Sequence, residues 1–220
     1  MLERFMHLHE RGLNATDTAK DNDPALFCRV CRTIRIDARD FTIKIAEQRP
    51  GTSPIATLDE KVTLIERKLV DLIGEDRIRK NLFVGRVIND RGKELENWMA
   101  LNGGLQEILV RGTREYGYRT CDGCDRIFYS SQGGRYIFPP PETNGRIYLT
   151  NLGGLLLEES SIDRASIPKS RWLGVEVLKA DPNPRDGFGN LEAQVASGAL
   201  PRAFPERFPS RWELAPRVED

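Results

Sequence analysis

Four cysteines, the only ones in the chain, form two pairs with two residues inside each pair. Cys28 and Cys31 lie in CRVC, and Cys121 and Cys124 lie in CDGC. A CxxC segment on a tight turn offers two sulfurs to one metal ion, and two such segments complete the tetrahedron of thiolates that zinc prefers. The pairs are 89 residues apart (121 − 31 − 1), whereas zinc-binding pairs are usually separated by about 15–20 residues. A shared site therefore requires residues 32–120 to be an insertion that returns the chain to its starting point.

Three other roles for the cysteines compete with zinc. A thioredoxin-like redox site needs a single CxxC at the start of a helix, which lowers the pKa of the thiol, and a second pair would have no role in it. A disulfide inside each CxxC would be strained and would close a very short loop. Four unrelated buried cysteines are the main remaining alternative, although chance seldom arranges them as two similar pairs. We therefore predict one structural Zn²⁺ held by Cys28, Cys31, Cys121 and Cys124, with no open position for catalysis.

The residue after each pair is not the glycine that often follows the second cysteine of a zinc knuckle. Glycine favours that position because the backbone turns there with a positive φ. Arg32 and Asp125 occupy the two positions, and Gly123 lies inside the second pair instead. The turns around the sulfurs are thus inferred from the cysteine spacing and not from a glycine signature.

No other group of residues indicates catalysis. His7 and His9 are the only histidines, and a pair at the protein surface is the simpler interpretation of them. Without a further histidine, nucleophilic catalysis of the Ser–His or Cys–His type is nearly excluded. The sequence also lacks a P-loop and a dinucleotide-binding glycine motif. We expect a binding protein and not an enzyme.

The composition limits the class of partner and the location. The 220 residues are 39% hydrophobic and 30% charged, as in globular proteins. Lys+Arg and Asp+Glu balance at 33 each, which argues against a nucleic-acid partner, because such binding usually needs a basic excess. No apolar run approaches the roughly 18 residues of a membrane span, and the chain does not start with a signal-peptide pattern. We expect a cytoplasmic protein with no membrane partner, in a compartment where structural disulfides are rare.

The sequence pattern around the cysteines predicts an α+β fold, with mixed or antiparallel strands and a few helices. This fold would position the cysteines. Residues 1–25 end in a polar run and are interpreted as an N-terminal lead-in. Residues 26–180 are predicted to form a single α+β domain with a split, zinc-ribbon-like site made by the two CxxC knuckles. The proline-rich residues 181–220 are interpreted as an extended tail.

The clearest predicted helix covers residues 57–73. Thr57 and Glu60 resemble a capping box, apolar residues recur on one helical face, and Gly74 ends the pattern. Residues 92–104 predict a short helix or a turn, and residues 126–138 predict a hairpin with SSQGG at its turn. Further strands are predicted within residues 33–45, 81–90, 105–112, 146–160 and 171–181.

The two CxxC pairs and the segment IYLTNLGGLLLEESSIDRASIPKSRWLGVEVLKA (147–180) resemble the double-CxxCG proteins. This bacterial family is abundant in myxobacteria and is counted among the immunity proteins that neutralise toxins delivered between kin cells. In the family one CxxC lies near the N-terminus and the second at mid-chain or later, and the C-terminal part contains a strand, a short helix and a second strand that GVEV matches here. The resemblance covers about residues 26–180. It implies cysteines that hold the fold, no catalysis, and a cognate protein toxin as partner.

Two functions follow from these observations. The first is a zinc-stapled interaction protein, an immunity protein that neutralises a bacterial toxin by binding it. The alternative is a zinc-ribbon protein that acts on nucleic acid as an accessory or regulator, using aromatic and arginine residues near the second CxxC pair.

Overall fold

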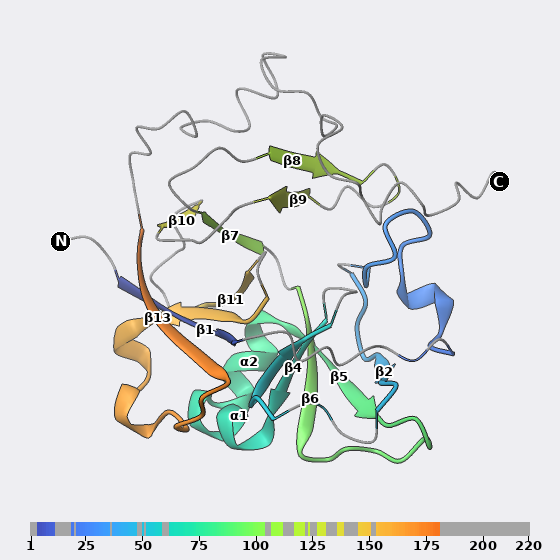
Figure 1. Ribbon diagram of the computed structural model, residues 1–220, viewed down its shortest axis with the longest axis horizontal. Helices are drawn as coiled ribbons and strands as arrows, with labels where there is room; N and C mark the ends of the chain where they lie inside the picture. Colours follow the sequence, from blue (N-terminus) through green and yellow to red (C-terminus); the bar gives the residue numbers. More distant parts are fainter. Residues whose placement is uncertain are drawn as a thin grey trace.

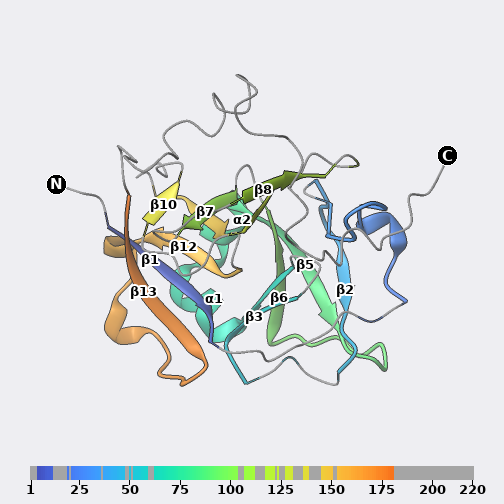
Figure 2. The same ribbon diagram turned by 45° about the horizontal axis from the view of Figure 1, so that its top comes forward.

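Six strands close into a barrel in the computed structural model of the protein (Figures 1 and 2). Their order is β1-β12-β11-β7-β10-β13, with both antiparallel and parallel neighbours. The bounds are β1 Arg4–Glu10, β7 Glu107–Arg111, β10 Tyr136–Phe138, β11 Ile147–Thr150, β12 Leu155–Glu158 and β13 Leu173–Ala180. The structure describes residues 4–11, 19, 21–35, 37–47, 50, 52–58, 62–103, 107–111, 117–121, 123, 127–130, 136–138, 145–150 and 153–180.

A second sheet has five strands in the order β2-β5-β6-β4-β3. The strands are β2 Thr42–Lys44, β3 Ile55–Thr57, β4 Thr63–Glu66, β5 Phe83–Ile88 and β6 Trp98–Asn102. Two helices, α1 (Arg67–Ile73) and α2 (Glu75–Asn81), connect β4 to β5. A separate hairpin pairs β8 (Gly117–Thr120) with β9 (Ile127–Ser130). Short 3-10 turns occur at Pro24–Leu26, Glu159–Ser161 and Arg164–Ser166. The predicted α+β class with mixed strands is therefore confirmed.

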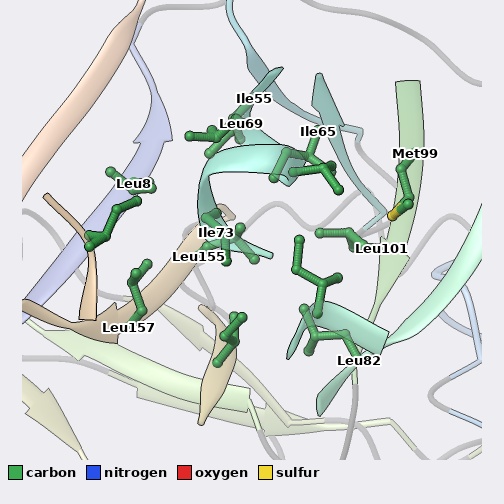
Figure 3. Packing of buried hydrophobic residues seen from close by; sticks show 14 of the residues in the cluster. Leu8, Ile55, Ile65, Leu69, Ile73, Leu82, Met99, Leu101, Leu155 and Leu157 are labelled. Atoms are coloured by element: carbon green, nitrogen blue, oxygen red, sulfur yellow. The ribbon is translucent and has the colours of Figure 1, made fainter. Parts of the chain in front are cut away.

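The main hydrophobic core lies between the barrel and the five-stranded sheet (Figure 3). Residues of α1 and α2 belong to the same core. Leu8 and Leu157 contribute from the barrel, Leu69 from α1, and Met99 and Leu101 from β6. A second cluster covers the other face of the sheet and contains Leu64, Ala100, Ile34, Phe41 and Ile43. Since Ile34 comes just after the first CxxC pair, burial of this residue ties that pair to the sheet.

The N-terminal segment contains a strand that the sequence interpretation missed. Residues 1–25 are predicted as a lead-in, but Arg4–Glu10 forms β1 and pairs with both β12 and β13. Phe5, Met6 and Leu8 are fully buried. Met6 to His9 alternate between apolar and polar residues, but the adjacent Phe5 and Met6 are both buried, so the alternation covers only four residues.

The predicted helix over residues 57–73 is correct only in its last seven residues. Thr63–Glu66 forms β4, a central strand of the sheet that pairs with β3 and β6. Leu64 and Ile65 are buried on opposite faces of β4, and Ile65 together with Val62 also matches one face of a helix. Gly74 ends α1 as predicted: its φ is 96°, and its N–H donates to the carbonyl of Val70 at 2.8 Å.

Two other local predictions are also wrong in part. Residues 92–104 include a turn at 96–97, which is one of the two predicted alternatives, but Trp98–Asn102 forms the strand β6. The two halves of the predicted hairpin over 126–138 do not pair: β9 pairs with β8, while β10 joins β7 and β13 in the barrel. The strand predictions within 81–90, 105–112 and 171–181 are confirmed as β5, β7 and β13. The predicted tail, 181–220, lies outside the described residues.

Candidate metal centre

The first CxxC pair lies on a tight turn closed by a bridge between Phe27 and Ile34. The Cys28 N–H donates to the Thr33 carbonyl at 2.9 Å, and the Arg32 N–H donates to the Cys28 carbonyl at 2.9 Å. Arg32 has a φ of 62°, which is the left-handed conformation expected of the residue after a knuckle. The backbone therefore makes the knuckle turn although a non-glycine residue occupies the critical position.

Of the second pair, the structure describes Cys121, which lies at the end of β8 in the β8–β9 hairpin. Cys121 follows β8 directly, and Gly123 lies in the turn before β9. The Gly123 N–H donates to Cys121 Sγ at 3.3 Å, the kind of amide-to-sulfur bond that steadies a thiolate ligand. Cys124 lies outside the described residues, so the structure places three of the four predicted ligands.

The three described cysteines meet although 89 residues separate the pairs (121 − 31 − 1). The sulfurs of Cys28, Cys31 and Cys121 lie within 4.8 Å of one another, and all three residues are buried. Cys28 Sγ and Cys121 Sγ are 3.7 Å apart. A disulfide would hold them at about 2.05 Å, whereas two Zn–S bonds of about 2.3 Å at the tetrahedral angle place sulfurs about 3.8 Å apart. The cluster could hold a metal ion.

Gly123 allows the second turn to approach the first. A Cβ built on Gly123 would lie 2.7 Å from Val30 Cγ2 and 3.1 Å from Cys28 Sγ. Val30 in turn packs against the cysteine cluster. The glycine inside CDGC therefore has a steric role: it lets the β8–β9 turn pack directly against the CRVC turn.

The electrostatics of the cluster disfavour a bare thiolate at Cys31. Burial raises the pKa of the Cys31 thiol, since the charged form loses its hydration, and the neighbouring Cys121 raises that pKa further. The Thr33 hydroxyl, 3.0 Å from Cys31 Sγ, acts in the opposite direction and lowers the pKa. A bound cation would supply the missing positive charge and displace the thiol protons.

A buried asparagine, which the sequence interpretation did not single out, fixes the segment after the first pair. Asn102, at the end of β6, is fully buried. Its side-chain amide donates to the carbonyls of Arg35 at 2.7 Å and of Ala38 at 3.2 Å. One sequence feature could have predicted this role: Asn102 directly follows the apolar run WMAL. A polar residue at the end of a buried strand needs hydrogen-bond partners.

The two histidines are not the surface pair that the sequence predicts. Only 2% of His7 is exposed, and the His9 side chain is 21% exposed. Burial lowers the pKa of His7 to about 4, and the nearby His9 ring lowers it as well. His7 is therefore a neutral core residue at pH 7, and the two rings stack with their centroids 4.8 Å apart.

A comparison with protein-family models finds no match for this chain, and a search of curated protein sequences also finds none. Among the residues that the structure describes, no helix has the length and apolar character needed to cross a membrane. The geometry alone thus defines the site as a buried cysteine cluster at the meeting point of two turns.

Proposed function

We propose that one Zn²⁺ joins the two CxxC turns as a structural, zinc-ribbon-like centre, and that the protein acts as an immunity protein that binds and neutralises a bacterial toxin. The observation that carries the metal part of this proposal is the convergence of Cys28, Cys31 and Cys121 across the fold. Cys124 is the fourth ligand in this proposal, since it completes the CxxC spacing that begins at Cys121.

The donor set supports a soft metal such as zinc over the hard cations Mg²⁺ and Ca²⁺. Three thiols in a buried cluster form a soft ligand environment, which suits Zn²⁺ and disfavours Mg²⁺ or Ca²⁺. The 3.7 Å separation of Cys28 Sγ and Cys121 Sγ is close to the edge of a ZnS₄ tetrahedron. A fourth thiolate would fill the last position, so the metal would hold the fold without carrying out a reaction.

The position of the centre supports a structural role. The chain between the two pairs forms the five-stranded sheet, both helices and β7, so the metal would close a loop that contains a large share of the core. Closing a long loop limits the unfolded ensemble more than closing a short one. Metal binding should therefore couple to global folding.

The binding role rests on the resemblance to the double-CxxCG proteins and on the charge balance of the chain. Equal numbers of acidic and basic residues suit a protein that recognises one protein surface through local patches. A buried centre with thiolates in every position offers no catalytic metal, which favours a partner-binding function over an enzymatic one.

Co-expression in bacteria tests the immunity role. The protein is produced together with a toxin encoded by the neighbouring gene, and an inactive toxin variant serves as the control. We expect growth to be restored and the two purified proteins to form a stable complex. Continued killing by the toxin, while the zinc-loaded protein remains folded in the same cells, would contradict the proposal. Salt-dependent retention on DNA or RNA would support the nucleic-acid alternative instead.

A further inference from the structure

A second group of potential metal ligands lies on the barrel, remote in sequence from the cysteines. His7 and His9 are on β1, and Glu176 is on the neighbouring strand β13 (Figure 1). One ligand atom from each residue lies within 4.8 Å of the other two. The proposed function does not use these residues.

The strand register brings the three side chains to one face. His7 and His9 are two residues apart, so both point to the same side of β1. Glu176 is the direct antiparallel partner of His7, and Gly174 is the partner of His9. A Cβ on residue 174 would lie 2.2 Å from His9 Nε2. The absence of a side chain at Gly174 therefore lets the His9 ring extend across β13 toward Glu176.

Backbone hydrogen bonds fix which nitrogen of each histidine carries its proton. His7 Nε2 lies 3.1 Å from the Gly153 carbonyl, and His9 Nδ1 lies 2.9 Å from the Glu10 carbonyl. A carbonyl oxygen only accepts, so each of these nitrogens must donate its N–H. In the neutral rings the lone pairs are thus on His7 Nδ1 and His9 Nε2.

Those two nitrogens are buried and have no hydrogen-bond partner among the described residues. His9 Nε2 lies 3.5 Å from Glu176 Oε1, and the Glu176 side chain is 48% exposed. When both rings are neutral, three electron-rich atoms therefore lie close together with no hydrogen between them. Such an arrangement is unfavourable unless a cation occupies the space between the atoms.

We propose that His7 Nδ1, His9 Nε2 and a Glu176 carboxylate oxygen form a second metal site, which binds Zn²⁺. Two imidazoles and a carboxylate form one of the common three-residue ligand sets of zinc, and bonds of about 2.0–2.1 Å place neighbouring ligand atoms about 3.3 Å apart. The distance of 3.5 Å from His9 Nε2 to Glu176 Oε1 fits that spacing.

The surroundings match those of a metal site in two further respects. Each ligating histidine donates its other N–H to a backbone carbonyl, which is the usual way to orient an imidazole toward a metal. His7 is held more firmly still, since Thr150 Oγ1 lies 3.1 Å from the same Nε2 and itself donates to the Gly153 carbonyl. The partial exposure of Glu176 leaves a position open to solvent, so water or a small anion completes the coordination.

The competing explanation is a simple ion pair, in which a proton on His9 Nε2 bonds to Glu176. Both explanations place a positive charge between the same atoms, but they differ in metal stoichiometry. The test therefore counts zinc, using the full-length protein whose cysteine site has first been filled with one equivalent of Zn²⁺. Isothermal titration with additional Zn²⁺ then measures the second site.

We expect the parent protein to bind one further equivalent of Zn²⁺, and Glu176→Gln to lose it. The affinity loss should exceed the roughly 10- to 100-fold produced by removing a partner in the outer shell of a metal site. Glu176→Gln conserves size at a half-exposed position, and unchanged circular dichroism confirms that it folds. Glu158→Gln, a substitution of the same kind on β12 at a position outside the three ligands, is the matched control and should retain the second equivalent.

Three results would overturn the proposal: no second equivalent in the parent, an equal second equivalent in folded Glu176→Gln, or its loss in the Glu158→Gln control. A thermal melt provides a second measurement for variants that fold poorly. Additional zinc should raise the Tm of the parent but not that of His9→Gln. Folded Cys121→Ser should retain the barrel site, so failure of the cysteine-centred proposal and failure of this one are distinguishable.

Discussion

Gly123→Ala is the substitution that tests most sharply whether the two CxxC turns pack against each other. The new Cβ would lie 2.7 Å from Val30 Cγ2, while ordinary van der Waals contact begins at 3.4 Å. The Val30 side chain or one of the turns must therefore move by about 0.7 Å, the difference between these two distances. Overpacking of this kind costs about 1–3 kcal/mol, and the same movement would displace Cys28 Sγ, which is 3.1 Å from the new atom.

The assay is urea denaturation at a fixed excess of Zn²⁺, because metal binding and folding are linked and their separation needs constant free metal. We expect Gly123→Ala to lower the unfolding free energy by about 1–3 kcal/mol and to weaken zinc binding in competition with a chromogenic chelator. Val30→Ala removes Cγ2, so the double variant should be more stable than the sum of the single effects predicts. The coupling energy should be about 1–2 kcal/mol, within the range for residues in contact. Additive effects, or a Gly123→Ala protein as stable as the parent, would refute the packing of the two turns.

Three further predictions concern single residues. Cys121→Ser should lower the Tm and reduce the destabilising effect of a chelator, because the metal would no longer link the two turns; a melt like that of the parent would contradict this. Arg32→Gly should raise the unfolding free energy by up to about 1 kcal/mol, since a non-glycine residue at positive φ is strained, whereas Arg29→Gly in the same turn should not. In chelator-treated protein, His7 has a folded pKa of about 4 against an ordinary 6.5, so only the unfolded state takes up a proton between these values and stability falls as the pH drops through that interval. The parent should lose about 2 kcal/mol between pH 7.5 and pH 5 that His7→Gln does not lose; parallel urea midpoints across this range would show the reasoning to be wrong.

The sequence predicts the elements whose hydrophobic pattern is unambiguous. Strands β5 and β13 and the end of α1 at Gly74 follow from local patterns, and the structure confirms them. The segment Thr63–Glu66 was assigned to a helix because apolar residues on both faces of a central strand imitate a helical stripe. Only the neighbours β3 and β6 make it a strand, and those contacts are tertiary.

The meeting of the two CxxC pairs was predictable from the sequence, but its geometry was not. The repeated CxxC spacing identifies Cys28, Cys31 and Cys121, which the structure brings together. The two pairs are separated by 89 residues, and long-range strand pairing brings them together. Local sequence patterns do not predict such pairing. A glycine after the second cysteine would predict a positive φ at that position. Arg32 has a positive φ without being glycine, because the fold imposes this conformation.

The group formed by His7, His9 and Glu176 on the barrel was not predictable for a different reason. The sequence HLH indicates a group of potential ligands only when Glu176 is known to be the cross-strand partner of His7. The first ten residues alone predict that both histidines lie at the surface. Burial of β1 between β12 and β13 changes the chemistry of both rings.

The central claim is that one zinc ion joins the two CxxC turns through cysteine sulfur alone. X-ray absorption at the zinc edge, on protein loaded with one equivalent of Zn²⁺, tests it directly because the spectrum gives the type, number and distance of the ligand atoms. The account predicts four sulfur neighbours at about 2.3 Å and no nitrogen or oxygen in the first shell. A shell dominated by nitrogen and oxygen, or a native protein that retains no zinc while all four thiols react freely, would contradict it.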